Sequence, residues 1–308
     1  MALSDQGQLY TTGSSEFGQL GNGETGEYFV TANKLAFANE TVFTLRNRFM
    51  EADPAQEMGG KDKLVPIQED IRFQAIACGK HHTIAVEASY ENEDDDDEPP
   101  RPRVFSWGCG NYGVLGHGIQ ADEYFPREIS CLQTTVWLPP GPLSVTCGAQ
   151  CCLLQTSNGH VYYWGKHRSV GEATMKPMLV DALANNRHVV SHCAAGGQTV
   201  VCCTENAQSV AWGQGPHGEL GFGAKKSSAK PDFVEALTGC RIQDVACGYG
   251  HTCYVVKDDD AEDKAAVKKL AVLDASAKDE LEAIFADSAA IAAATTSKKK
   301  KAGKKKKG

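Results

Sequence analysis

A glycine-rich pattern recurs along residues 1–256 and constrains the fold more than any other feature of the chain. Three segments read LYTTGSSEFGQLGNG at 9–23, VFSWGCGNYGVLGHG at 104–118 and SVAWGQGPHGELGFG at 209–223. In each, two glycines five residues apart are followed by x-Leu-Gly-x-Gly. A weaker copy, VYYWGKHRSVG at 161–171, keeps the apolar run and its first glycine. Because glycine accepts tight turns and close backbone approach, the pattern predicts short strands that end in glycine turns.

Two of these segments, 108–113 and 213–218, also fit G-x-G-x-x-G, the phosphate-binding turn of dinucleotide folds. That turn must open a long helix whose N-terminus faces the pyrophosphate. Neither segment is followed by a helical pattern, since IQADEYFP and AKKSSAKP come next. We therefore expect no nucleotide or other cofactor and interpret the glycines as turn residues of the repeat. They are Gly13, Gly18, Gly21, Gly108, Gly113, Gly116, Gly165, Gly213, Gly218 and Gly221.

A second signature closes each unit. It reads IACGKHHTIAV at 76–86, VTCGAQCCLLQ at 145–155 and VACGYGHTCYV at 245–255, with the weaker HCAAGGQTVVC at 192–202. The chain thus contains four tandem units. Their approximate bounds are 1–87, 103–156, 159–204 and 207–256. A four-stranded unit cannot bury both of its faces alone, so neighbouring units must stack, and the pattern predicts an all-β propeller.

These units resemble the regulator-of-chromosome-condensation repeat family, whose fold is a seven-bladed β-propeller. The resemblance covers residues 1–256 and rests on the Trp-Gly or Thr-Gly strand end, the x-x-Gly-x-Leu-Gly-x-Gly turn and Cys-Gly-x-x-His-Thr in two units. The degenerate third unit with EATMKP at 172–177, GELGFG at 218–223 and the charged exit at 258–270 are similar to one subtype of the family.

The resemblance implies an interaction propeller that binds or regulates a small GTPase of the Ran or Rac type, in chromosome, mitotic spindle or cytoskeletal functions. It implies exchange-factor-like behaviour without acid–base residues, because the propeller would bind the nucleotide-free GTPase better than the loaded form. No G-x-S-x-G, H-E-x-x-H or G-x-x-x-x-G-K-[ST] motif occurs, so the sequence predicts no enzyme.

Four units in a family of seven-bladed rings imply an incomplete ring. The start, MALSDQGQLY, aligns with the inside of a strand in the other units, so earlier blades are expected upstream. End blades of this kind would expose apolar faces and strand edges, which favours self-association.

We expect two inserted loops, at 36–72 and 88–102. The second contains the acidic run ENEDDDDEPP at 91–100, whose like charges repel one another. It is either a solvated loop or a docking strip for a basic partner such as a histone tail.

The cysteines and histidines give no metal-binding pattern. None of the twelve cysteines forms a C-x-x-C motif, and there is no secretory signal, so we expect buried, reduced thiols in a soluble protein of the nucleus and cytoplasm. Neighbouring strand residues point to opposite faces, so Cys151-Cys152 and Cys202-Cys203 should not bond to each other. We interpret His81-His82 and His192-Cys193 as packing and turn residues, with no metal site.

From residue 257 the composition changes. The segment 257–296 is rich in Ala, Lys, Glu and Asp and predicts a helical extension without a membrane span. The segment 297–308 is predicted to be a disordered tail, which either binds polyanions, directs nuclear import or is a solvated end without a partner. Its lysines are Lys298, Lys299, Lys300, Lys301, Lys304, Lys305, Lys306 and Lys307. This tail supports the alternative function, a scaffold that binds chromatin, nucleic acid or microtubules.

Removal of residues 297–308 should abolish polyanion binding and leave small-GTPase binding intact, because the two depend on different parts of the chain. If all eight tail lysines met phosphates on duplex DNA, log K against log salt would slope at about −7, an upper bound. Fluorescence anisotropy with a labelled duplex over a salt series measures this slope. Binding by the tail peptide that does not change with salt would contradict the prediction.

Overall fold

The computed structural model describes residues 1–53, 63–88, 101–134, 136, 138–139, 141–167, 171–185, 188–223 and 227–270. The chain divides into two compact units, Met1–Val255 and Val256–Gly308. The described part of the second unit contains a helix over 261–270. The remainder of the expected helical extension and the lysine tail lie outside the described residues, as does most of the acidic loop. Among the described residues, no helix is both long enough and apolar enough to cross a membrane.

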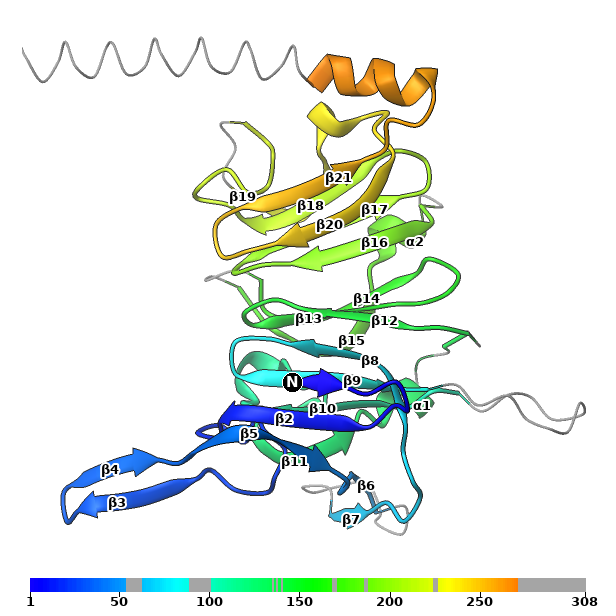
Figure 1. The fold of residues 1–308 in the computed structure, drawn as a ribbon. Coiled ribbons are helices and arrows are strands. Elements are labelled where there is room, and N and C mark those ends of the chain that lie inside the picture. Colours follow the sequence, from blue (N-terminus) through cyan, green and yellow to red (C-terminus); the bar gives the residue numbers. More distant parts are fainter. Residues whose placement is uncertain are drawn as a thin grey trace, which may run out of the picture. The chain divides into compact units, whose positions relative to one another are not determined.

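The first unit consists of successive β-sheets, each packed against the next (Figure 1). The first sheet has the order β1-β2-β5, and a separate hairpin, β3-β4, is inserted between its last two strands. The strands are β1 (Ala2–Leu3), β2 (Leu9–Ser14), β3 (Glu27–Thr31), β4 (Lys34–Phe37) and β5 (Asn39–Arg46).

The second sheet has six strands in the order β7-β6-β11-β10-β9-β8. Neighbouring strands in this sheet pair antiparallel, except β11 and β6, which pair in parallel. Its strands are β6 (Met50–Ala52), β7 (Leu64–Pro66), β8 (Phe73–Cys78), β9 (His82–Glu87), β10 (Val104–Gly108) and β11 (Glu123–Glu128).

Two four-stranded antiparallel sheets and a strand pair follow, each in chain order. Their strands are β12 (Ser144–Cys147), β13 (Cys151–Gln155), β14 (Val161–Gly165) and β15 (Thr174–Leu179), then β16 (Val190–Ala195), β17 (Thr199–Thr204), β18 (Ser209–Gln214) and β19 (Ser227–Phe233), then β20 (Ile242–Cys247) and β21 (Thr252–Val256). Single helical turns occupy some of the connections. They are η1 (Asn111–Gly113), α1 (Cys131–Thr134), α2 (Asp181–Ala184) and η2 (Glu235–Leu237).

The sequence repeats and the sheets are out of phase, which differs from the expectation that each repeat folds as one blade. Repeat 103–156 supplies β10 and β11 to the second sheet and β12 and β13 to the third. The reason is that β9, at the end of one repeat, pairs with β10, at the start of the next. Each repeat therefore joins two neighbouring sheets.

The structure also changes the interpretation of the long first repeat, residues 1–87. The expected loop 36–72 contains β5, β6 and β7, and β5 completes the first sheet by pairing with β2. The hairpin is instead inserted earlier, at Glu27–Phe37. Its turn lies between Thr31 and Lys34, which face each other across the strands. The β-branched and aromatic residues EYFVT favour strand structure here.

The hydrophobic core lies between successive sheets. Side chains from the first and second sheets form one cluster, and those from the second and third form another. A third cluster joins the third and fourth sheets. Cys151 belongs to this third cluster and Cys152 to the second, so the two neighbours do point to opposite faces, as expected. None of the twelve cysteines forms a disulfide in the structure. Six are buried, as expected, whereas four are half-buried and two, Cys78 and Cys253, are exposed.

A repeated hydrogen bond ties three of the glycine turns to the following sheet. In each of these turns the acceptor is the carbonyl of the residue that precedes the Leu-Gly pair. Trp107 Nε1 donates to the Gln19 carbonyl at 3.0 Å, and Trp164 Nε1 donates to the Val114 carbonyl at 2.8 Å. A threonine hydroxyl does the same from Thr252 to Glu219, at 2.8 Å.

Trp164→Phe should lower the free energy of unfolding by about 1–2 kcal/mol, because it removes the donor to the Val114 carbonyl and keeps an aromatic ring in the core. Trp164→Ala should cost about 3–5 kcal/mol, since it also opens a cavity. Urea unfolding followed by fluorescence measures both. Equal losses for the two variants would contradict a separate contribution from the hydrogen bond.

Acid should destabilise the first unit through His117. Burial lowers the pKa of His117 well below 6.5, and the positive charge of Arg127 lowers it further. Its Nε2 lies 3.1 Å from Ser106 Oγ, which in turn donates to the Leu115 carbonyl. The unfolded chain therefore binds a proton that the folded chain resists, and stability is lost as the pH falls below 6.5.

Replacing this group tests the effect. His117→Gln should flatten the pH dependence of the unfolding free energy between pH 7.5 and pH 5, where one proton accounts for up to about 1.4 kcal/mol per pH unit. Urea titrations at both pH values give the two slopes. An unchanged slope in the variant would show that other groups control the acid sensitivity.

Candidate functional site

The predicted turn glycines lie at strand ends and in the turns that follow. All ten have a positive φ. At Gly108 the pairing of β10 with β11 shifts register, and a Cβ there would lie 2.4 Å from the His81 carbonyl oxygen. After Gly108 the chain enters only the three-residue turn η1, so the G-x-G-x-x-G segment opens no long helix. These glycines shape the turns, and their φ values explain why other residues are disfavoured there.

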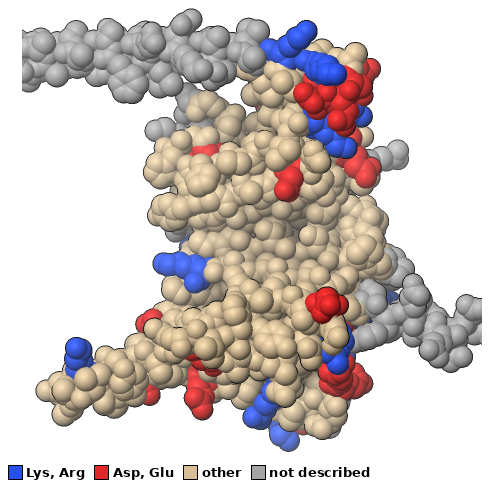
Figure 2. Space-filling model, viewed as in Figure 1, with Lys and Arg blue, Asp and Glu red and all other residues tan. Residues whose placement is uncertain are grey.

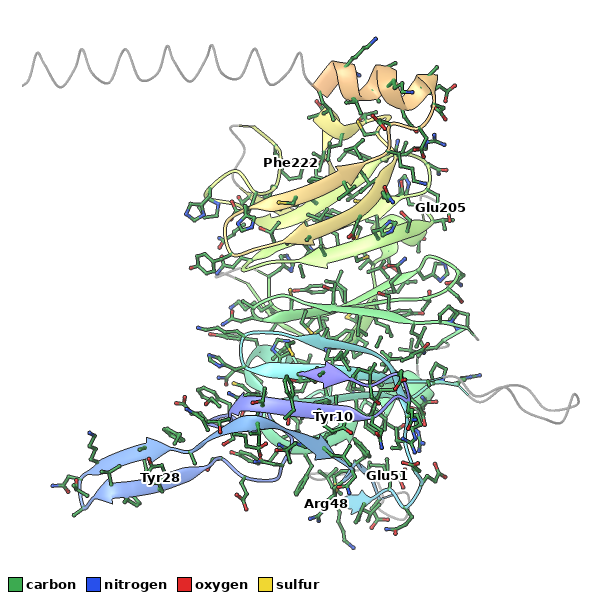
Figure 3. The ribbon with its side chains drawn as sticks, viewed as in Figure 1. Tyr10, Tyr28, Arg48, Glu51, Glu205 and Phe222 are labelled. Carbon is green, nitrogen blue, oxygen red and sulfur yellow. The ribbon has the colours of Figure 1, made fainter. Side chains whose placement is uncertain are left out.

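The most distinctive surface of the first unit is an apolar arm made by the hairpin and the adjoining edge strand. In Figure 1 the hairpin extends away from the sheets, and Figure 3 shows Tyr28 on it. Phe29 and Val42 are each 69% exposed, and Phe43 is 57% exposed. The apolar arm consists of Tyr28, Phe29, Val30, Leu35, Val42, Phe43 and Leu45. Several exposed apolar side chains on one hairpin and its adjoining strand make this a candidate interaction surface.

Backbone geometry adds to this surface. In the described residues β5 pairs on one side with β2 and is the edge of its sheet. Phe29 and Leu35 face each other across the hairpin, and β4 leads into β5 through Ala38 alone. An exposed edge strand with apolar side chains on both faces can accept another protein through backbone and side-chain contacts.

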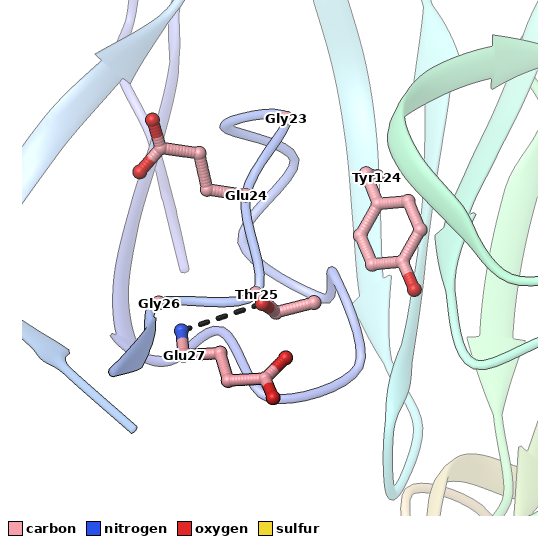
Figure 4. A pocket seen from close by; sticks show the side chains of 6 residues that line it. All are labelled: Gly23, Glu24, Thr25, Gly26, Glu27 and Tyr124. Carbon is pink, nitrogen blue, oxygen red and sulfur yellow. Dashed lines mark hydrogen bonds between the residues drawn. The ribbon is translucent and has the colours of Figure 1, made fainter. Parts of the chain in front are cut away.

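A shallow acidic pocket of about 380 Å³ lies at the foot of the hairpin (Figure 4). Its lining residues are Gly23, Glu24, Thr25, Gly26, Glu27 and Tyr124. The loop is fixed to β11, since the Gly23 N–H donates to the Tyr124 carbonyl at 2.8 Å. Within the loop, the Glu27 N–H donates to Thr25 Oγ1 at 3.3 Å. The pocket carries two exposed carboxylates, of which Figure 4 shows Glu24 turned away from the Tyr124 ring, and carboxylates suit the basic side chain of a partner.

The charges on the visible face are sparse over the apolar arm. Figure 2 shows the hairpin mainly free of acidic and basic side chains, with carboxylates near its base. The combination is an apolar centre with acidic groups at its rim, which is the usual composition of a protein interface.

A second cluster combines groups that ligate metals. His82, Cys147 and Cys152 place their ligand atoms within 4.8 Å of one another. Cys152 Sγ lies 3.2 Å from His82 Nε2 and 3.9 Å from Cys147 Sγ. The hydrogen bond with Cys152, together with His82, lowers the pKa of Cys147 to about 6, whereas burial raises the pKa of Cys152.

Sequence reasoning missed both sites. The apolar arm overlaps the expected loop 36–72, although the β-branched and aromatic residues of EYFVT could have indicated a strand. The His–Cys cluster joins two different repeats, and its members had been interpreted as packing residues. No short spacing between these residues in the sequence indicates the cluster. The predicted polyanion-binding lysines, Lys298–Lys307, lie outside the described residues.

Comparisons with known proteins agree with this architecture. The family model described as the regulator of chromosome condensation (RCC1) repeat matches residues 103–155 and 211–255. The chain is 29% identical over 273 residues to the RCC2 homolog of Danio rerio, covering 88% of this chain and 50% of that protein. It spans about half the length of the curated relatives it matches.

Two solved structures share the fold. Human WBSCR16 matches with a TM-score of 0.56 and 21% identity, covering 83% of this chain and 55% of that one. Prp20p of Saccharomyces cerevisiae matches with a TM-score of 0.53 and 20% identity, covering 84% and 53%. The predicted β-propeller architecture is therefore confirmed. The chain belongs to the regulator of chromosome condensation (RCC1) repeat family and is similar in sequence to its RCC2 members.

Proposed function

We propose that this chain is a non-enzymatic interaction propeller that binds a small GTPase of the Ran or Rac type through its apolar arm. The observation that carries the proposal is the exposure of Phe29, Val42 and Phe43 on a hairpin and edge strand. Family membership supports the class of partner, since the solved structure of Prp20p is described with its binding to Gsp1p and to histones. Aromatic side chains are the residues that most often dominate the energy of such interfaces.

Regulation of the GTPase would follow from a difference in affinity. A propeller that binds the nucleotide-free GTPase more tightly than the loaded form shifts that equilibrium toward nucleotide release. The shift can be no larger than the difference in binding free energy between the two forms. The described residues of the apolar arm include no acid–base pair, which fits a mechanism by binding alone.

The acidic pocket would fix the orientation in which the partner binds the apolar arm. Glu24 and Glu27 line it beside Tyr124, at the foot of the hairpin. A lysine or arginine of the partner would enter here while apolar side chains cover Phe29 and Phe43. Rim charges of this kind act mainly on the association rate and on its salt dependence.

The lysine-rich end supports a second function. Eight lysines within 298–308 suit an electrostatic contact with chromatin, nucleic acid or microtubules, and also suit nuclear import. The acidic run 91–98 would in turn attract a basic partner such as a histone tail. Under this proposal the tail and the loop localise the propeller to chromosomes or the spindle, and the apolar arm engages the GTPase.

The Phe29→Asp and Phe43→Asp variants should each weaken binding of a nucleotide-free Ran- or Rac-type GTPase by about 30-fold or more, as expected for a central aromatic contact. Surface plasmon resonance with immobilised GTPase in nucleotide-free, GDP and GTP forms measures this. The wild-type chain should bind the nucleotide-free form most tightly. Glu24→Lys with Glu27→Lys should mainly slow association at low salt.

Tyr249→Asp is the matched control, because Tyr249 is 85% exposed in the loop between β20 and β21, outside the apolar arm. All of these substitutions replace exposed side chains and should change stability by no more than about 0.5 kcal/mol, which circular dichroism during thermal unfolding verifies. Equal binding by wild type, Phe29→Asp and Phe43→Asp would contradict the proposed surface. No binding by the wild type to any Ran- or Rac-type GTPase would contradict the proposed partner.

A further inference from the structure

We propose that His82, Cys147 and Cys152 form a zinc site that joins the second and third sheets. His82 begins β9 in the second sheet, whereas Cys147 ends β12 and Cys152 lies in β13 of the third. The three residues come from two different repeats, and sequence analysis assigned no metal site to them. The inference is independent of the proposed GTPase function.

The two sulfurs are already spaced for a shared metal ion. A zinc ion about 2.3 Å from each of two thiolates holds them about 3.8–4.0 Å apart. Cys147 Sγ and Cys152 Sγ lie 3.9 Å apart. A disulfide would instead require an S–S distance of about 2.05 Å, so the sulfurs would have to move much closer. Their spacing therefore favours a bridging ion.

The imidazole is close to the position of a third ligand. Zinc–nitrogen and zinc–sulfur bonds of the usual lengths place the two ligand atoms about 3.6 Å apart. His82 Nε2 lies 3.2 Å from Cys152 Sγ, so the imidazole would have to move a few tenths of an ångström away from this sulfur to reach a bonding position. All three ligand atoms lie within 4.8 Å of one another.

Rigid backbone holds the ligands in place. Cys147 and Cys152 are direct partners in the β12–β13 ladder, and His82 pairs with Gly108 in the β9–β10 ladder. The His82 ring lies against Gly79, where a Cβ would be only 2.0 Å from its Cε1 atom. Gly79 thus leaves room for this ring position, which any larger residue would block. A site on strands is better fixed than one on loops.

Hydrogen bonding also permits the change from thiol to thiolate. Cys152 Sγ lies 3.3 Å from the Val114 carbonyl oxygen, to which a thiol can donate. When the thiol proton is lost, that carbonyl still accepts the 2.8 Å hydrogen bond from Trp164 Nε1. No buried acceptor is left without a donor, which removes one cost of metal binding.

Charge favours a divalent ion. Two thiolates and a neutral imidazole carry a charge of −2, which Zn²⁺ neutralises, whereas Cu⁺ would leave a net negative charge in a buried place. His82 and Cys152 are buried, and Cys147 is half-buried. A water molecule reaching the ion from the Cys147 side would supply the fourth ligand that zinc prefers.

Metal titration of the reduced, metal-free chain, residues 1–308, tests this site. Zn²⁺ in competition with a chromophoric chelator should bind with a stoichiometry of one. Co²⁺ should give the thiolate-to-metal charge-transfer absorption of a site with two cysteines. Zn²⁺ should also raise the midpoint of thermal unfolding, since it binds the folded chain, and the midpoint should fall again with a chelator.

The variants assign the ligands. Cys147→Ser with Cys152→Ser should weaken zinc binding by about 100-fold or more, because the ion loses both thiolates, and His82→Gln should weaken it less. Cys193→Ser with Cys202→Ser is the matched control. These two cysteines also face each other across a ladder, with their sulfurs 3.5 Å apart, and belong to no His–Cys cluster among the described residues. The control variant should bind zinc as the wild type does.

Three results would overturn the proposal: no stoichiometric zinc binding by the wild type, equal binding by the Cys147–Cys152 variant, or loss of binding in the control variant. Selective binding of Cu⁺ in place of Zn²⁺ would overturn the choice of ion. If the double variant does not fold, Cys147→Ser alone replaces it, since Cys147 is half-buried at a strand end. In that variant zinc should no longer raise the unfolding midpoint, and an undiminished rise would also overturn the proposal.

Discussion

Packing of one sheet on the next is the constraint on which the rest of this structure depends. No sheet can bury both of its faces by itself, so each hydrophobic cluster is shared between two sheets. The glycine turns make that packing specific. They present the carbonyls of Gln19, Val114 and Glu219 to donors on the following sheet. A turn of this shape requires positive φ, which is why glycine recurs there while the residues between the glycines vary.

The phase between repeat and sheet reinforces the same packing. Because each repeat ends in strands of the next sheet, the chain passes from one sheet to the next within a repeat, while ladders such as β9–β10 join two repeats within one sheet. Separating two sheets would therefore break a shared core, the turn hydrogen bonds and the continuity of a repeat. The rigid sheets leave the connections between strands to vary, and the β3–β4 hairpin is one such insertion. Its exposed aromatic residues contribute little to the core, which is typical of a surface that is free to serve in binding.

The two candidate sites use the scaffold in different ways. The apolar arm lies outside the sheet stack and depends on side chains that the fold does not need. The His–Cys cluster lies between two sheets and depends on the fold for its geometry, since a histidine of one repeat meets two cysteines of the next. An ion bound there would add a link between sheets that already share a core, so metal binding and stability would be coupled.

The sequence by itself determined the repeat, the all-β propeller architecture and the turn role of its glycines, because backbone conformation at a glycine turn is a local property. Only the tertiary structure decided the phase of the repeats, since a period is visible in sequence whereas hydrogen-bond partners are not. The same holds for β5, whose pairing with β2 turned an expected loop into an edge strand. It holds most clearly for His82, Cys147 and Cys152, which are brought together by packing between sheets and not by their spacing along the chain.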